Sequence, residues 1–290
     1  MKKVARMELG GRQSNSHILY TVSMPKPSTD TIDAAHIRQI LAANSDFVFE
    51  ISVLKALRKL ALTCRHGGTY EDPVTGKTRQ FDIQAEAGRI DRSDPLVRFR
   101  FAVECKNIGR NFPLVVHRLP RDASEAYLDV VVATRPSPGM LLDYSKRLTL
   151  ANDGSPYAVA DRVGKAFDQI GRTAGGDVFS SDQDVFEKMT QALNSSKHLL
   201  EQSHYAATPT EPVLFSIVVP VLVVPSGSLW VVDYDDDGNV IDGPTVQLVA
   251  STFVGKEWLV GGKLGRSFTL SHIEIVTFDA LFIICLGLAR

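Results

Sequence analysis

Two short stretches of the chain, residues 79–87 and 97–106, alternate between apolar and polar side chains, and this alternation constrains the fold more than any other feature. Successive side chains of a β-strand point to opposite faces of the sheet, so a period of two is typical of a strand with one buried face. The apolar faces consist of Phe81, Ile83, Ala85 and Ala87 in the first stretch and of Phe99, Phe101, Val103 and Cys105 in the second. The sequence therefore predicts a strand at each place.

Helical spacing, capping residues and turn residues predict the remaining elements. Asp30 or Thr31 can cap a short helix through Leu41, and Ser45-Asp46 is typical of the start of a stronger helix over residues 45–63. Further predictions are turns over 66–78, a strand over 113–118, helices over 156–173 and 180–205, and strands between 213 and 285. Residues 121–135 fit either a helix or a strand.

This order of elements predicts the fold class and a division of the chain. A helix, a block of strands, two helices and more strands are typical of an α/β or α+β domain with a central mixed sheet flanked by helices. We expect an N-terminal arm over residues 1–30, a core over 31–205, and a β-rich part over 206–290 that packs on the core or completes it.

Composition narrows the class of protein. The chain has 290 residues, of which 44% are hydrophobic and 22% charged, as in ordinary globular proteins. Residues 1–150 carry 23 Lys and Arg against 16 Asp and Glu, whereas residues 151–290 carry 9 against 17. The basic first half can face a polyanion, and scattered surface charge explains it equally well.

Cysteine usage and apolar runs bear on the compartment. The three cysteines are far apart and show no metal-binding spacing, which favours a reducing, cytoplasmic setting. No apolar core follows the basic N-terminus, so we expect no signal peptide. The longest apolar runs, 213–225 and 280–289, are too short for a membrane-spanning helix, and we expect buried strands there and no membrane partner.

The polar faces of the two predicted strands carry charged side chains. The face opposite Phe81 carries Asp82, Gln84 and Glu86, and the face opposite Phe101 carries Arg98, Arg100, Glu104 and Lys106. Glu104 and Lys106 then point to the same side, about 7 Å apart along the strand. If the two strands pair in the right register, Asp82 lies beside Glu104.

A third carboxylate comes from the predicted helix over residues 45–63. Glu50 has Val53 at i+3 and Leu54 at i+4, so its carboxylate lies along the core-facing stripe, where it needs a partner. Three carboxylates and a lysine suit metal-assisted phosphodiester hydrolysis, because hard oxygen ligands hold Mg²⁺ or Mn²⁺ and an ammonium stabilises developing negative charge. The backbone carbonyl of Cys105 can supply a further hard ligand.

Asp82 followed after about twenty residues by Glu104-Cys105-Lys106 resembles the motif of the PD-(D/E)xK nuclease superfamily. The hairpin over residues 70–85 is similar to the one that carries the Asp in several members, although Phe81 stands where many have proline. The resemblance covers about residues 46–120, can extend to residue 173, and implies a restriction-endonuclease-like fold. It implies Asp82 and Glu104 as metal ligands, Lys106 as the catalytic lysine, and Glu50 as an auxiliary acid that binds a metal water or a second ion.

The resemblance also implies a cofactor, a substrate and contact residues. The cofactor is Mg²⁺ or Mn²⁺, the partner is nucleic acid, most simply DNA, and the activity is phosphodiester hydrolysis by an endonuclease. Many members place a glutamine on the helix after the core strands, and Gln169 matches it if residues 156–173 are helical, with Gln84 as a second auxiliary residue. Candidate phosphate contacts are Lys77, Arg79, Arg98 and Arg100. The oligomeric state stays open, a homodimer included.

Several alternatives remain. Glu104 and Lys106 can be a solvated strand end, and the chain can be a non-catalytic nucleic-acid-binding or scaffold protein that retains the nuclease fold. A third alternative is a metal-dependent enzyme that acts on a phosphoester outside nucleic acid. The GKT of residues 76–78 lacks the upstream glycine of a phosphate-binding loop, so a turn is expected there. Residues 233–244 begin like a calcium loop but end in Pro244, and a hairpin turn is the better interpretation.

Overall fold

We describe a computed structural model of the chain. It describes residues 30–87, 96–137, 140–150, 155–203, 213–259 and 267–283, so the predicted arm over residues 1–29 lies outside it. The chain divides into two compact units, residues 1–39 and 40–290. Helix α1 (Ala34–Asn44) begins in the first unit and ends beyond Leu41, its predicted last residue. The Asp33 carboxylate caps this helix by accepting hydrogen bonds from the backbone amides of Ala35 and His36.

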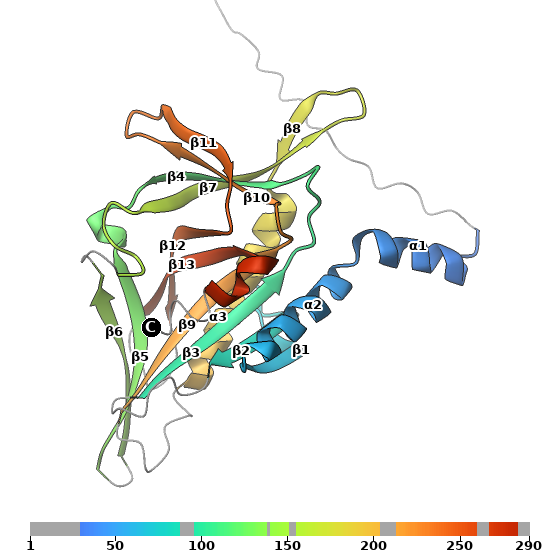
Figure 1. The fold of residues 1–290 in the computed structure, drawn as a ribbon. Coiled ribbons are helices and arrows are strands. Elements are labelled where there is room, and N and C mark those ends of the chain that lie inside the picture. The colour runs from blue at the N-terminus through green and yellow to red at the C-terminus, as the bar shows by residue number, and fades with distance from the viewer. Residues whose placement is uncertain are drawn as a thin grey trace, which may run out of the picture. The chain divides into compact units, whose positions relative to one another are not determined.

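The second unit is built on one large mixed sheet. Its strands are β1 (Thr63–Glu71), β2 (Thr78–Ala87), β3 (Leu96–Cys105), β4 (Leu114–Pro120), β5 (Tyr127–Ser137), β6 (Met140–Thr149), β7 (Arg162–Arg172), β8 (Val178–Ser181), β9 (Val213–Val224), β10 (Leu229–Tyr234), β11 (Val240–Val246), β12 (Val249–Leu259) and β13 (Ser267–Thr277). They follow the order β1-β2-β3-β9-β13-β12-β7-β4-β10-β11, with β5, β6 and β8 paired off this path (Figure 1). The expected α/β class with a mixed sheet is confirmed, and the molecule is richer in strands than predicted.

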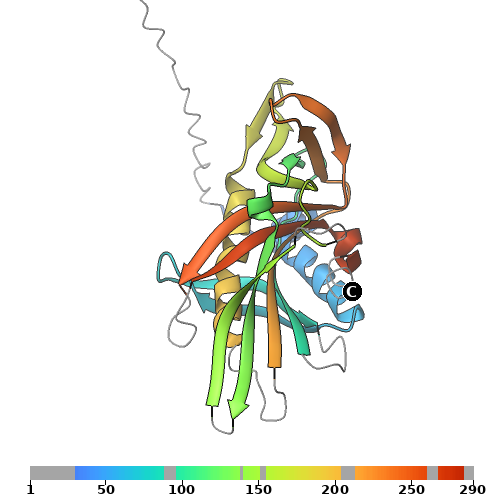
Figure 2. The same cartoon turned by 90° about the vertical axis from the view of Figure 1, so that its left-hand side faces the viewer.

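Two helices flank the part of the sheet that holds the candidate site. Strands β1, β2 and β3 are antiparallel, and β9 runs parallel to β3 over ten residue pairs. Helix α2 (Asp46–Lys59) packs Val53 and Leu57 against the face of Ile83 and Phe101. Helix α3 (Gln183–Ser203) packs on the opposite face, with its C-terminal half against Ala102 and Val218 (Figures 1 and 2).

The predicted start of α2 is confirmed. Ser45 has an extended backbone, and its hydroxyl accepts a hydrogen bond from the Val48 amide, which satisfies one of the free amides of the first turn. The helix ends at Lys59, and Ala61 follows with a positive φ of 61°. No helix among the residues that the structure describes is long and apolar enough to cross a membrane.

The helix predicted over residues 156–173 is wrong, because most of that stretch forms strand β7. β7 pairs antiparallel with β4 on one side and with β8 on the other, and this pairing overrides a local pattern that also fits helical spacing. β7 also meets β12 through a single pair, Gly164 with Thr252. A Cβ on Gly164 would lie 2.5 Å from the Thr252 Oγ1 atom, so only glycine allows this approach.

Turn predictions are confirmed in part. The segment 66–78 begins as strand, since β1 extends to Glu71, and only the following residues form the turn. Asp72 closes that turn by accepting from the Val74 and Thr75 amides, as expected for a strand connection rather than a phosphate-binding loop. Asp235 closes the β10–β11 hairpin in the same way, so the calcium-like sequence is a turn. The ambiguous segment 121–135 is a short 3₁₀ turn (Ala123–Glu125) followed by β5.

Candidate functional site

Asp82 and Glu104 meet where β2 and β3 separate. The last cross-strand pair before the separation is Ile83 with Val103. Beyond this pair, the Asp82 side chain takes the place of a backbone acceptor on β2. Its Oδ2 atom accepts a hydrogen bond of 2.8 Å from the Cys105 amide. The Asp82 amide in turn donates to Glu104 Oε1 at 3.4 Å. The structure therefore brings these two predicted residues together.

A third residue, Lys188, holds the two carboxylates in one cluster. Its Nζ atom lies 2.8 and 3.1 Å from the two Asp82 carboxylate oxygens and 3.2 Å from Glu104 Oε2. Glu104 is fully buried, and the Asp82 and Lys188 side chains are 10% and 17% exposed. These three side chains, called the carboxylate–lysine cluster below, come from β2, β3 and α3.

Sequence reasoning missed Lys188, although a signal was present. Lys188 lies three residues after Val185 and four before Ala192, so it belongs to the buried stripe of α3. A lysine on such a stripe needs a buried anionic partner, because an unpaired ammonium is costly to remove from water. The helical periodicity of residues 180–205 thus indicated that Lys188 needs a buried anionic partner, but it did not identify Asp82 and Glu104 as that partner.

Burial and mutual charge shift the protonation equilibria of the cluster. Burial, followed by repulsion from Asp82, raises the pKa of Glu104 well above its usual value. Burial alone would lower the pKa of Lys188, but the charges of Glu104 and Asp82 outweigh it and raise that pKa. Lys188 therefore stays charged at neutral pH, and Glu104 takes up a proton at a higher pH than an exposed glutamate does.

Glu50 lies near the cluster but outside it. It is on α2, which covers the sheet face opposite the one that carries Asp82, and its Oε2 lies 3.3 Å from His66 Nε2. Burial, and next the charge of Asp82, raises the pKa of Glu50. The expected core-facing position is thus observed, whereas a direct contact with the other two carboxylates is not.

Lys106 does not contact Glu104. Strand β3 ends at Cys105, so the strict alternation that placed Lys106 on the Glu104 face no longer applies. The Lys106 Nζ atom lies 3.8 Å from Asp46 and 3.7 Å from Asp184. It lines a pocket of about 250 Å³ together with Asp184, Glu187, Lys188 and Gln191. Two lysines, one of them bound to the carboxylates, thus face one pocket.

The two predicted auxiliary glutamines lie in different places. Gln169 is buried on β7, where its Nε2 donates to the Phe112 carbonyl at 3.2 Å, so its assignment to a helix after the core strands is wrong. The helix that follows the core strands is α3, and its Gln191 lines the pocket of Lys106 and Lys188. Gln84 lies two residues beyond Asp82 on β2 and is 7% exposed.

The predicted phosphate contacts divide into two groups. Arg98 and Arg100 both pair with Glu86, at 3.2 and 3.1 Å, and Arg100 also donates to the Leu199 carbonyl, which ties β3 to α3. These two arginines are therefore structural links rather than open contacts. Lys77 is exposed in the β1–β2 turn, and Arg79 is 42% exposed and 3.9 Å from Glu187, so both remain surface groups.

The donor set of the cluster fits a hard divalent cation. Over the described residues, no three His, Cys, Asp or Glu side chains gather closely enough to hold a metal. Mg²⁺, however, is commonly held by one or two carboxylates, waters and substrate phosphate. Asp82 and Glu104 already converge on one cationic group, the Lys188 ammonium, and this is the position that a divalent ion would share with it.

Comparison of the chain with protein-family models, curated proteins and solved structures finds no match.

Proposed function

We propose that this protein is a metal-dependent nuclease that hydrolyses phosphodiester bonds of DNA. The observation that carries the proposal is the convergence of Asp82 and Glu104 on the Lys188 ammonium, beside a pocket that Lys106 and Lys188 line. The element order supports a restriction-endonuclease-like core, with a first helix (α2), a hairpin that carries Asp82, a strand that ends in Glu104-Cys105-Lys106, and a following helix (α3).

Each side chain has a role that its surroundings support. Asp82 and Glu104 would hold Mg²⁺ or Mn²⁺, which when bound polarises a phosphoryl oxygen and lowers the pKa of a coordinated water. The ammonium groups of Lys106 and Lys188 face the same pocket, where they can bind the substrate phosphate and offset developing negative charge. Glu50 would act as an auxiliary acid near Asp82, whose charge contributes to raising the pKa of Glu50.

Lys188 and a divalent ion would compete for the same carboxylates. The four-carbon stem of Lys188 lets its ammonium swing into the adjacent pocket while α3 stays in place. The ammonium that balances the carboxylates before the cation enters would then lie beside the phosphate. The pairing with Lys188 explains why the buried carboxylate pair is stable without a divalent ion.

Cleavage of supercoiled plasmid DNA tests the proposal. The protein is incubated with Mg²⁺, with Mn²⁺ and with EDTA, and Asp82→Asn and Glu104→Gln are compared with Asp168→Asn, a control on β7 that pairs with His117. We expect cation-dependent cleavage that both cluster variants lose by at least about a hundredfold and the control retains. Cation-dependent cleavage that persists in Asp82→Asn would contradict the site, and wild-type protein that never cleaves would contradict the function.

A second candidate function is a non-catalytic nucleic-acid-binding or scaffold protein with the same fold. Lys188 favours it, because its ammonium already satisfies both carboxylates. Thermal unfolding with Mn²⁺ separates the two candidates. A rise in Tm for the wild type that disappears in Asp82→Asn supports the nuclease, whereas a rise that appears only after Lys188→Met supports the scaffold.

A further inference from the structure

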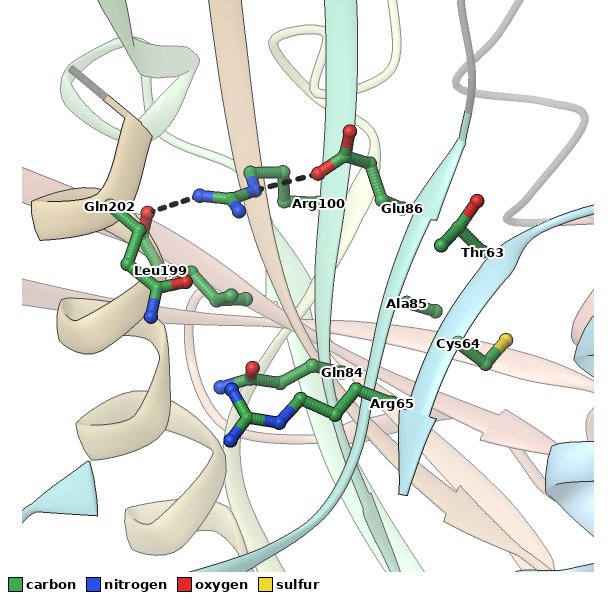
Figure 3. A pocket seen from close by; sticks show the side chains of 9 residues that line it. All are labelled: Thr63, Cys64, Arg65, Gln84, Ala85, Glu86, Arg100, Leu199 and Gln202. Carbon is green, nitrogen blue, oxygen red and sulfur yellow. Dashed lines mark hydrogen bonds and ion pairs between the residues drawn. The ribbon is translucent and has the colours of Figure 1, made fainter. Parts of the chain in front are cut away.

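A second cavity lies on the same sheet face as the carboxylate–lysine cluster. It has a volume of about 190 Å³ and is lined by residues of β1, β2, β3 and α3, namely Thr63, Cys64, Arg65, Gln84, Ala85, Glu86, Arg100, Leu199 and Gln202 (Figure 3). Gln84 and Asp82 are alternate residues of β2, so they point to the same face about 7 Å apart. This cavity, called the Gln84 pocket below, is larger than the ~30 Å³ that one water occupies.

The Gln84 pocket contains a buried donor with nothing to bind. Gln84 is 7% exposed, and its Nε2 atom has no hydrogen-bond partner. Leaving a buried amide group unsatisfied costs about 1–3 kcal/mol, and an apolar side chain of similar size would avoid the cost. Packing alone therefore gives no reason for an amide at this position, whereas a ligand that offers an acceptor does.

Arg65 supplies a second set of free donors. It is the cross-strand partner of Gln84, and both side chains extend toward α3 (Figure 3). Its guanidinium lies 5.6 Å from the centre of the Phe81 ring, and no carboxylate within the described ranges is paired with it. Arg100, on the opposite wall, is already bound to Glu86 and to the Leu199 carbonyl. Gln84 and Arg65 thus bring unpaired donors to the pocket.

We propose that the Gln84 pocket binds a guanine base of a single-stranded or extruded nucleotide. Guanine presents two adjacent acceptors, N7 and O6, on one edge, whereas adenine and cytosine place a donor on theirs. Arg65 and Gln84 match the two acceptors, and Leu199 and Ala85 give apolar walls for the ring. A base stacked in a duplex cannot enter a cavity beneath α3, so the nucleotide has to be unstacked.

This inference rests on the proposed function, since it places the base next to a strand that the carboxylate–lysine cluster would cut. It adds a specificity that the cluster alone does not provide. A nucleic-acid strand whose phosphate lies at Asp82 can place a neighbouring base at Gln84, because both residues are on one face of β2.

Binding measured in EDTA tests the pocket without cleavage. Fluorescence anisotropy compares labelled oligo-dT strands that carry one central dG, dA or dC, and free GMP serves as a competitor that distinguishes a base within a strand from a free nucleotide. A good pair of base contacts corresponds to roughly five- to hundredfold in affinity. We expect the dG strand to bind at least about fivefold more tightly than oligo-dT, with GMP competing only weakly.

Two substitutions and a control complete the test. Gln84→Leu should abolish the guanine preference without lowering Tm, and Gln247→Leu, the same change in a glutamine that bonds to Thr245, should preserve the preference. Gln84→Glu should shift the preference toward cytosine, whose N4 amino group donates.

Equal affinity for all strands, or a guanine preference that survives in Gln84→Leu, overturns the inference. Absence of cleavage with a guanine preference intact would instead overturn the nuclease alone, and competition by GMP as strong as by the strand would reassign the pocket to free nucleotide.

Discussion

Replacing Lys188 by methionine should destabilise the protein strongly, and a divalent ion should reverse the loss. The ammonium makes three contacts of 2.8 to 3.2 Å to Asp82 and Glu104, of which Glu104 is fully buried. Methionine keeps the length of the stem and removes the charge, so the two carboxylates are left facing each other without compensation.

The size of the effect follows from the burial. Removing one partner of a buried ion pair costs about 3–5 kcal/mol, and the 17% exposure of Lys188 favours the lower end. For a domain of this size, a loss of about 3 kcal/mol lowers Tm by roughly 6–12 °C. The loss should shrink at low pH, because the pKa of Glu104 is raised by burial and by Asp82 and rises further without Lys188. A folded state that binds a proton which the unfolded state lacks gains stability as pH falls toward the unfolded pKa of about 4.3.

Urea unfolding at pH 8 and pH 5.5, with Mn²⁺ or EDTA, measures these effects. A matched control is Lys197→Met on the same helix, whose ion pair with the half-exposed Glu201 should be worth less than about 1 kcal/mol. We expect Mn²⁺ to stabilise Lys188→Met more than wild type, by about 2.7 kcal/mol at a hundred times Kd. An unfolding midpoint equal to that of Lys197→Met, with no dependence on pH or Mn²⁺, would refute the reasoning.

Three other substitutions test the fold. The His272 ring is 3% exposed with both nitrogens unpaired, and burial, then the charge of Arg121, lowers its pKa to about 3. The unfolded state takes up the proton first as pH falls below about 6.5, so between pH 7 and 5 wild type should lose about 2 kcal/mol relative to His272→Phe in urea unfolding. Gly164→Val should lower the free energy of unfolding by about 1–3 kcal/mol, since the added side chain would meet Thr252, and an unchanged Tm would contradict this contact. Ser45→Ala should cost about 1 kcal/mol by removing the cap of α2, measured against Ser45→Asp, which keeps an acceptor.

The part of the site that could be predicted depends on local periodicity. Alternation within β2 and β3 identified the faces of Asp82 and Glu104, and one register then fixed their proximity. Glu50 was placed toward the core for the same reason, but helical spacing does not say which face of the sheet a helix covers. Lys106 was misplaced because the alternation stops where β3 ends at Cys105.

The parts that could not be predicted depend on contacts between distant segments. Lys188 belongs to the site only because α3 packs on β3 and β9, which no local pattern states. Residues 162–172 form β7 because β4 and β8 pair with them, and a helical pattern in isolation carries no sign of those partners. Pairing of β9 with β3 across more than a hundred residues likewise becomes visible only in the folded chain.

That separation between β3 and β9 has a consequence for synthesis on the ribosome. Asp82 and Glu104 emerge well before Lys188 and before β9, the strand that pairs with β3, so a nascent chain carries the two acids without a counter-charge. Parallel pairing across so long a span also makes for slow folding. The chain should therefore acquire a closed site only after residue 224 has left the exit tunnel, and a fragment ending near residue 180 should have none. The proposed nuclease would in this way stay inert until the segment that forms β9 has been synthesised.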